Sequence, residues 1–198
     1  MDRLTLYGSF TSSSSYKPML YLALARLPFS FRTVNLKTGV QRTPEYLAVN
    51  RWGVVPSLRH RDLTILQSNV ILDYLARETG HFEGRTEQQR WQAREWLTWE
   101  ADHITYVAKV RHSARFRASH PETIAEFRPR AEAALSFVDE TVKDQPFLVG
   151  DNCTIADIVA GAAWCSCPRA GLRSPTGPTS THGRGASRRC RASRFPMI

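Results

Sequence analysis

The sequence contains few cysteines and no long hydrophobic run. Its four cysteines, Cys153, Cys165, Cys167 and Cys190, all lie in the last quarter of the 198 residues and lack the spacing of a zinc site. They therefore define neither a disulfide framework nor a metal site. No apolar stretch approaches the roughly 20 residues that a membrane-spanning helix needs, and no apolar signal core follows residues 1–3. These absences predict a cytoplasmic protein with no membrane partner and no metal.

Acidic residues are absent after Asp157, although the whole chain carries a formal net charge of +9 at pH 7. Residues 1–163 contain 20 Lys and Arg against 18 Asp and Glu, so this part of the chain is nearly neutral. The remaining positive charge comes from seven arginines between Arg169 and Arg194. No aromatic platform or groove-reading helix accompanies these arginines, which argues against specific nucleic-acid recognition.

Residues 164–198 also lack hydrophobic periodicity. They are rich in Arg, Ser, Gly and Pro and cannot bury a core, so they predict a disordered basic tail. The helix expected after Thr154 is cut short after about three turns. Such an abrupt change is typical of translation in a shifted frame of a GC-rich gene. This hypothesis predicts that the other two frames past Ala163 encode amphipathic helices.

The first 80 residues alternate strand and helix patterns. Residues 4–7 alternate as a half-buried strand does, and a helix with apolar positions three and four residues apart follows Ser12 to Ser15. The four serines fit either a polar linker that caps the helix or a hydroxyl directed at a bound thiol or anion. A second strand begins at Phe29 and a short helical turn at Thr43. The pattern predicts an α/β unit, β-α-β followed by β-β-α.

The stretch from Asn50 to Arg77 carries three local signals in a fixed order. Pro56 interrupts a short strand, which places it at a sheet edge or in a cis peptide bond and holds Val55 extended. Val55 can offer its backbone N–H and C=O to a peptide-like ligand. Gln67 and Ser68 open a helix whose unpaired N–H groups form a site for a carboxylate or phosphate. Taken singly, an edge proline and a helix cap explain the same residues at least as well.

From residue 86 onward the patterns are purely helical. A capping box at Thr86 opens a helix that we expect to reach Phe116. At 1.5 Å per residue it would be about 45 Å long, which predicts that it either kinks or spans two contacts. A further capping box runs from Thr154 to Asp157. The predicted apolar positions are Leu97, Ala101, Ile104 and Ala108 on the long helix and Ala131, Leu135 and Val138 on the next.

Taken together, these motifs resemble the glutathione S-transferase superfamily, most of all its bacterial and zeta-class members. The resemblance covers residues 3 to about 163. It implies a thioredoxin-like, glutathione-binding domain over residues 1–80 and an incomplete helical transferase domain over residues 86–163. The matching segments are Ser12-Ser13-Ser14-Ser15-Tyr16-Lys17, Gly39–Leu47, Asn50–Pro56, Leu66–Leu75 and the Thr154–Asp157 box.

The resemblance also implies where glutathione, the co-substrate, would bind. Val55 would pair with the cysteinyl backbone across a cis-Pro56, and Gln41 would reach the glycyl end. Ser12 would donate a hydrogen bond to the sulfur. Ser14 is the alternative donor, because the family often has a different pair where Ser13-Ser14 stands. The implied site comprises Ser12 or Ser14, Gln41, Val55, Pro56, Gln67 and Ser68, with the last two holding the γ-glutamyl carboxylate.

The implied activity is attack of the glutathione thiolate on an electrophilic small molecule by a homodimeric enzyme. The electrophile would meet the loop after the first strand and the middle of the long helix, where the candidates are Phe10, Tyr106, Lys109 and His112. Lys109 and His112 fit a solvated helix face equally well. Two alternatives stay open: a noncatalytic glutathione-fold binding protein, and an impaired product of a frameshifted transferase gene.

Overall fold

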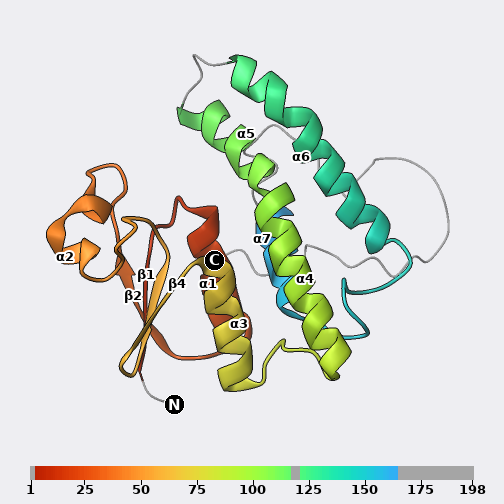
Figure 1. Ribbon diagram of the computed structural model, residues 1–198, viewed down its shortest axis with the longest axis horizontal. Coiled ribbons are helices and arrows are strands. Elements are labelled where there is room, and N and C mark those ends of the chain that lie inside the picture. The colour runs from red at the N-terminus through yellow and green to blue at the C-terminus, as the bar shows by residue number, and fades with distance from the viewer. Residues whose placement is uncertain (1–2, 117–120, 165–198) are drawn as a thin grey trace. The chain divides into compact units, whose positions relative to one another are not determined.

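The computed structural model describes residues 3–116 and 121–164 (Figure 1). The chain divides into two compact units, Met1–Glu83 and Gly84–Ile198. Residues 165–198, which hold nearly all of the predicted basic tail, lie outside the described residues. The hypothesis of a shifted frame concerns the same segment and stays a prediction.

The N-terminal unit contains a four-stranded mixed sheet with the strand order β2-β1-β3-β4. β1 pairs in parallel with β2, and β1 and β3 as well as β3 and β4 are antiparallel. This is the thioredoxin-like arrangement, and it confirms the predicted β-α-β and β-β-α units. The elements are β1 (Leu4–Gly8), α1 (Ser13–Leu24), β2 (Phe29–Thr33), the 3-10 turn η1 (Val40–Arg42), α2 (Pro44–Leu47), β3 (Ser57–His60), β4 (Leu63–Leu66) and α3 (Ser68–Thr79).

The core of this unit lies where α1 and α3 pack side by side against the sheet (Figure 1). Alternation along β1 turns Leu4 and Leu6 inward, and Leu6 lies opposite Leu58 of β3. Burying each such leucine contributes about 1.5–3 kcal/mol, so these apolar faces hold the two helix N-termini in place. The buried helix side chains are Leu20, Tyr21 and Leu22 of α1 and Ile71, Leu72 and Leu75 of α3.

The second unit is helical, with α4 (Glu87–His103), α5 (Thr105–Phe116), α6 (Pro121–Thr141) and α7 (Ile155–Trp164). The predicted long helix is interrupted at Ile104, where α4 ends and α5 begins. The capping box at Thr86 is also present. The predicted apolar position at Ala101 is wrong, since this residue is exposed and Glu100 is buried instead. A single methyl group gains too little from burial to set which face of the helix turns inward.

The segment before α7 is fixed by the side chain of Asp157. Its carboxylate accepts hydrogen bonds from the Leu148 N–H at 2.8 Å, the Thr154 N–H at 2.8 Å and the Thr154 hydroxyl at 3.1 Å. Burial raises the pKa of Asp157, and these hydrogen bonds oppose the rise. Asp157 thus forms its half of the predicted capping box, the bond to the Thr154 N–H, and it also ties the preceding loop to the helix.

Across residues 3–116 and 121–164, no helix combines the length and the apolar character that crossing a membrane requires. The same residues contain no cluster of three or more His, Cys, Asp or Glu side chains arranged to hold a metal ion. Cys153 is the one cysteine in these ranges, and its thiol donates to the Thr154 carbonyl oxygen at 3.9 Å.

Candidate functional site

The loop between β1 and α1 gives the serines distinct roles. Ser12 is the N-cap of α1, and its Oγ accepts a hydrogen bond from the Ser15 N–H at 3.2 Å. A hydroxyl that accepts one bond keeps its hydrogen for donation, so Ser12 can cap the helix and still donate to a ligand. Ser15 is buried, and its Oγ accepts from the Ser9 N–H at 3.2 Å, which is a structural role. Ser14 lies in the first turn of α1 and is half-buried.

The Val55–Pro56 peptide bond is cis, which confirms one of the two placements predicted for this proline. β3 begins at Ser57, which pairs with Tyr7 of β1. Val55 precedes Ser57 by two residues and therefore lies outside the paired part of the strand. Within the described ranges, the backbone N–H and C=O of Val55 have no hydrogen-bond partner. This unpaired backbone is the kind of edge that binds an extended peptide as an added strand.

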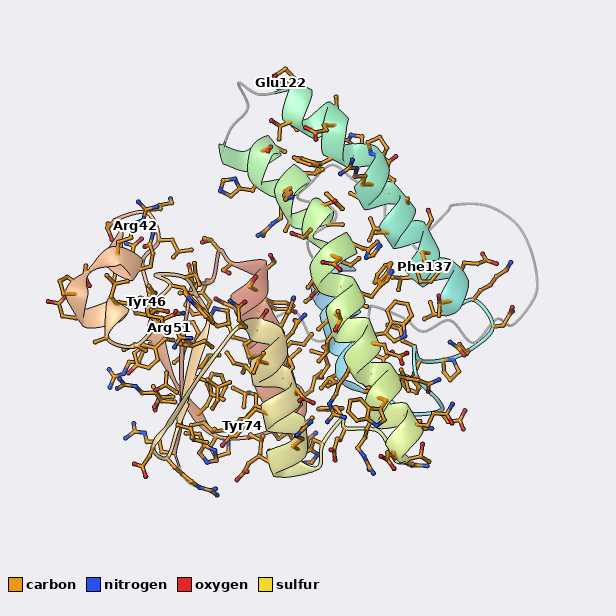
Figure 2. All side chains as sticks on the ribbon, in the orientation of Figure 1. Arg42, Tyr46, Arg51, Tyr74, Glu122 and Phe137 are labelled. Atoms are coloured by element: carbon orange, nitrogen blue, oxygen red, sulfur yellow. The ribbon has the colours of Figure 1, made fainter. Side chains whose placement is uncertain are left out.

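A buried polar network holds the backbone that leads to Val55. The hydroxyl of Tyr46, labelled in Figure 2, donates to the Val54 carbonyl at 2.8 Å. The Asn50 amide donates to the same carbonyl at 2.7 Å and to the Ser57 Oγ at 3.1 Å. Asn50 and Ser57 are fully buried, and burial raises the pKa of the Tyr46 hydroxyl. The network therefore fixes the Val54 carbonyl and, through it, the orientation of the next peptide.

The contribution of Tyr46 and Asn50 was missed by sequence reasoning. The sequence did carry one signal of a turn, which is Asn50 three residues before Gly53. In the structure the Asn50 Oδ1 accepts from the Trp52 N–H at 3.0 Å, as in an Asx turn. Gly53 has φ 61°, which favours glycine. A turn was thus predictable, but its contact with Ser57 and Tyr46 was not.

Gln41 lies in η1, on the other side of this turn. A Cβ added to Gly53 would lie 3.0 Å from the Gln41 carbonyl oxygen, so the glycine lets the two segments approach closely. The side-chain Oε1 of Gln41 is buried and has no hydrogen-bond partner among the described residues. Leaving a buried acceptor unpaired costs about 1–3 kcal/mol, so this oxygen marks a place where a ligand N–H or a water would be favourable.

The N-terminus of α3 gathers positive charge. Gln67 has φ 70° and an exposed side chain, and Ser68, the first helical residue, is 9% exposed. The ammonium of Lys17, on α1, donates to the Asn69 Oδ1 at 3.0 Å, and Lys17 is only 8% exposed. A buried cation beside the positive end of a helix dipole favours a carboxylate. The roles of Lys17 and Asn69 were not predicted, because only the packing of α1 on α3 brings them together.

The four residues predicted to meet an electrophile lie in different units. Phe10 belongs to the N-terminal unit, is 69% exposed, and its ring centre lies 4.8 Å from that of Phe31. Tyr106 of α5 stacks on Phe127 of α6 at 5.6 Å. The Lys109 ammonium lies over the rings of Tyr106 and Phe127, at 5.0 and 4.7 Å from their centres. His112 is exposed one turn further along α5. A shared electrophile pocket for these residues stays a prediction.

Both units match domains of known proteins. Residues 2–77 match the N-terminal domain of glutathione S-transferases, and residues 101–173 match the C-terminal domain. Glutathione S-transferase F10 of Arabidopsis thaliana is 30% identical over 168 residues, covering 78% of this chain and 76% of that protein. Human glutathione S-transferase theta-2 is 27% identical over 167 residues, covering 79% and 68%.

A solved structure gives the same result. The crystal structure of a glutathione S-transferase from Pseudomonas fluorescens Pf-5 is 28% identical to this chain, with a TM-score of 0.80, and the match covers 86% of this chain and 87% of that one. These similarities point to theta-class, plant and bacterial transferases and not specifically to the zeta class. The C-terminal match also extends ten residues past Ala163, where the sequence predicted the end of ordered structure.

Proposed function

Because this chain belongs to the glutathione S-transferase family, we propose that it binds glutathione in its N-terminal unit and activates the thiol for attack on an electrophilic small molecule. The observation that carries the proposal is the unpaired backbone of Val55 beside cis-Pro56. Glutathione is a short peptide, so its cysteinyl backbone can pair with Val55 in antiparallel fashion.

The two ends of glutathione then meet groups of matching chemistry. The γ-glutamyl carboxylate accepts from the backbone and hydroxyl of Ser68 at the N-terminus of α3, beside Gln67 and close to the Lys17 ammonium. The backbone N–H of the glycyl residue can donate to Gln41, whose buried amide oxygen has no partner among the described residues. Together these contacts leave the cysteinyl side chain directed at the loop before α1.

Ser12 activates the thiol in this proposal. The pKa of a free thiol is near 8.5 and must fall by about two for the thiol to be mostly ionised at neutral pH. This fall requires that the site stabilise the thiolate over the thiol by about 2.7 kcal/mol. One hydrogen bond to a charged group contributes about 1.5–3 kcal/mol and a helix N-terminus about 0.3–1 kcal/mol. Ser12 Oγ, at the N-terminus of α1, combines both. The thiol releases its proton to solvent, the thiolate forms a carbon–sulfur bond with the electrophile, and the leaving group departs with its electron pair.

The proposal includes three finer points carried by the family resemblance. We infer a cytoplasmic homodimer, and we keep addition to and elimination from an activated double bond, the isomerase chemistry of zeta-like members, as the alternative to conjugation. Ser14 remains the alternative to Ser12 as the thiol-activating residue.

Calorimetric titration with S-hexylglutathione, combined with turnover of glutathione and 1-chloro-2,4-dinitrobenzene, tests the function. Binding together with release of chloride supports a transferase. Binding without turnover of any aryl halide, epoxide or activated alkene supports the noncatalytic binding protein. A folded chain that does not bind S-hexylglutathione overturns the proposal, and a chain that does not fold supports the impaired gene product.

A further inference from the structure

β2, the outer strand of the N-terminal sheet, has an open edge. Within the described part of the chain it pairs with β1 alone. The Val34 N–H donates to the Gly8 carbonyl at 2.7 Å, so the even-numbered residues here direct their backbone groups toward β1. Because these groups alternate in direction along a strand, the N–H and C=O groups of Phe29, Phe31 and Thr33 point away from the sheet. Such an open row of donors and acceptors can pair with another extended chain.

The helix side of this edge is apolar. Phe29 and Phe31 lie opposite the inward-facing leucines of β1, so their rings lie on the side of the sheet that α1 and α3 cover. Both phenylalanines are half-buried. The ring of Phe10, which is 69% exposed, has its centre 4.8 Å from that of Phe31 and extends the apolar strip. A strand added to β2 would therefore meet apolar surface on this side.

The opposite side of the edge is basic. Ser30 and Arg32 are the residues of β2 whose side chains turn outward. The Arg3 Nε donates to the Ser30 Oγ at 3.0 Å, so a second guanidinium reaches β2 close to Arg32. Both arginines are exposed, and no carboxylate among the described residues pairs with either. Two neighbouring outward side chains of an added strand would each face a guanidinium.

We propose that the β2 edge binds an extended peptide in which acidic and apolar residues alternate. The peptide backbone pairs with the open edge, and its apolar side chains pack beside the rings of Phe29 and Phe31. Its carboxylates accept hydrogen bonds from Arg3 and Arg32, whose planar guanidinium groups suit carboxylate oxygens. This site is on a different strand from Val55, so it does not depend on the proposed binding of glutathione.

Charge favours this partner over two others. Residues 165–198 contain no Asp or Glu, so this segment of the chain cannot supply the carboxylates. A second copy that paired through its own β2 would bring Arg3 and Arg32 of both copies together, and like charges on neighbouring strands are destabilising. A separate acidic peptide meets neither obstacle.

A fluorescein-labelled peptide of about eight alternating glutamates and valines, followed by fluorescence anisotropy, tests the proposal. We expect Arg3→Gln and Arg32→Gln each to weaken its binding about two- to fivefold, as loss of an exposed cross-strand ion pair does. Arg59→Gln is the matched control, because Arg59 is exposed on the same side of the sheet but on β3. Three strand spacings, about 14 Å, separate it from the added strand, which exceeds the Debye length of about 8 Å.

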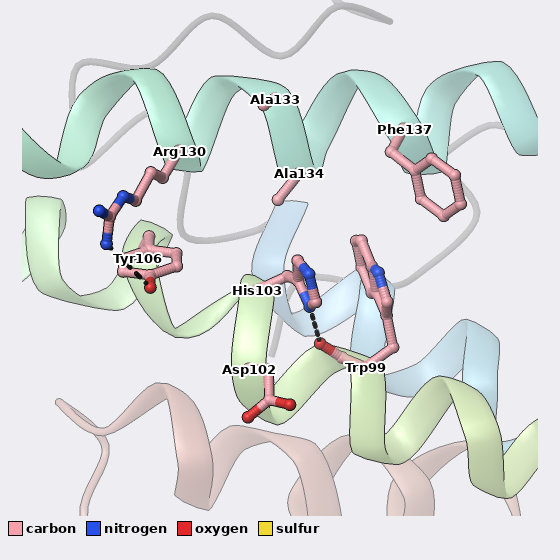
Figure 3. Close-up of a pocket in the computed structure, with 8 residues that line it drawn as sticks. All are labelled: Trp99, Asp102, His103, Tyr106, Arg130, Ala133, Ala134 and Phe137. Atoms are coloured by element: carbon pink, nitrogen blue, oxygen red, sulfur yellow. Dashed lines mark hydrogen bonds between the residues drawn. The ribbon is translucent and has the colours of Figure 1, made fainter.

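A control in the helical unit removes the same charge elsewhere. Arg130→Gln does so at α6, where the guanidinium donates to the Tyr106 hydroxyl at 3.2 Å (Figure 3). Neither Arg59→Gln nor Arg130→Gln should change binding of the peptide.

Pairing through the backbone has its own test. Thr33→Pro removes an outward N–H, and edge strands tolerate proline at such positions. This variant should weaken the peptide about three- to tenfold, whereas Thr33→Val, which keeps the N–H, should not. Two modified peptides, one N-methylated at every valine and the other at every glutamate, complete the test. One of them should no longer bind, because only alternate residues of an added strand turn their N–H groups toward β2.

Five results would overturn the proposal. The first is no binding of the peptide by the folded wild type, and the second is equal weakening by Arg32→Gln and Arg59→Gln. The third is unchanged binding of both N-methylated peptides, which would leave charge attraction alone. The fourth is displacement of the peptide by excess S-hexylglutathione, which would assign it to the edge at Val55. The fifth is a wild-type dimer that Thr33→Pro makes monomeric, which would make β2 a subunit contact. Arg3, Arg32 and Thr33 are exposed, so the variants should fold, which circular dichroism checks.

Discussion

Replacing Ser12 with alanine separates helix capping from thiol activation. Ser12 Oγ accepts from the Ser15 N–H at 3.2 Å, and in the proposed complex its O–H donates to the glutathione sulfur. Alanine removes both bonds. Loss of the cap should lower the free energy of unfolding by about 1 kcal/mol. Loss of a hydrogen bond to a thiolate should cost about 1.5–3 kcal/mol, which raises the pKa of the bound thiol by about one to two units.

The expected change in ionisation is large. A bound thiol of pKa about 6.5 is about three-quarters ionised at pH 7, whereas one of pKa about 8.5 is only about 3% ionised. The assay follows the ultraviolet absorbance of the thiolate in the glutathione complex against pH, alongside urea unfolding of the free protein. Glutathione affinity at pH 7 should fall only about fourfold, which is the loss linked to the higher pKa of the bound thiol, because Val55 and Ser68 still bind the peptide backbone and carboxylate. Ser12→Thr, which keeps the hydroxyl, should restore both the cap and the thiolate.

The outcome at Ser14 decides between the two candidate serines. If Ser14→Ala removes the thiolate absorbance and Ser12→Ala keeps it, the assignment of Ser12 is wrong. If Ser12→Ala and Ser12→Thr lose the thiolate equally, the hydroxyl is not the donor.

Three further predictions concern the surroundings of the site. Asn50→Ala should lower the free energy of unfolding by about 2–3 kcal/mol, since it leaves buried polar atoms unpaired, and should also weaken binding of S-hexylglutathione. Asn35→Ala, which removes only an exposed bond from the Lys37 N–H, should cost less than about 1 kcal/mol and leave binding unchanged; calorimetry and urea titration measure both effects. Gln67→Gly should raise the free energy of unfolding by about 1 kcal/mol, because glycine adopts the φ of 70° without strain, and it should weaken glutathione binding. An unchanged free energy of unfolding would show that the backbone is not strained at this residue. Burial raises the pKa of Tyr21 from 10 to about 12, so the stability that the protonated hydroxyl contributes is present below pH 10 and is lost as the pH rises to about 12. The difference in free energy of unfolding between wild type and Tyr21→Phe should therefore narrow by up to about 2.7 kcal/mol over that range. A difference that stays constant with pH would contradict this prediction.

Much of the fold was predictable from local patterns. Alternation in residues 4–7, the serines before α1, the Thr86 box and the Thr154–Asp157 box each give their signal within a few residues. Such signals depend on backbone geometry and nearby polar groups, which act before tertiary contacts form. The buried face of α4 was predicted less well. Ala101 has so little apolar surface that its place in the sequence pattern does not show whether it is buried or exposed. Glu100 is buried, although glutamates rarely are.

The sequence by itself determined the order of strands and helices, the position of the proline before β3 and the polar first turn of α3. It did so because proline, glycine and capping side chains restrict or hydrogen-bond the backbone of their own segment. Only the tertiary structure decided which groups meet across elements. The Lys17 ammonium reaches Asn69 across 52 residues, Asn50 reaches Ser57 behind the turn, and Arg130 of α6 donates to Tyr106 of α5. Contacts of this kind depend on how helices pack and which side chains fit, and no local pattern in the chain records that.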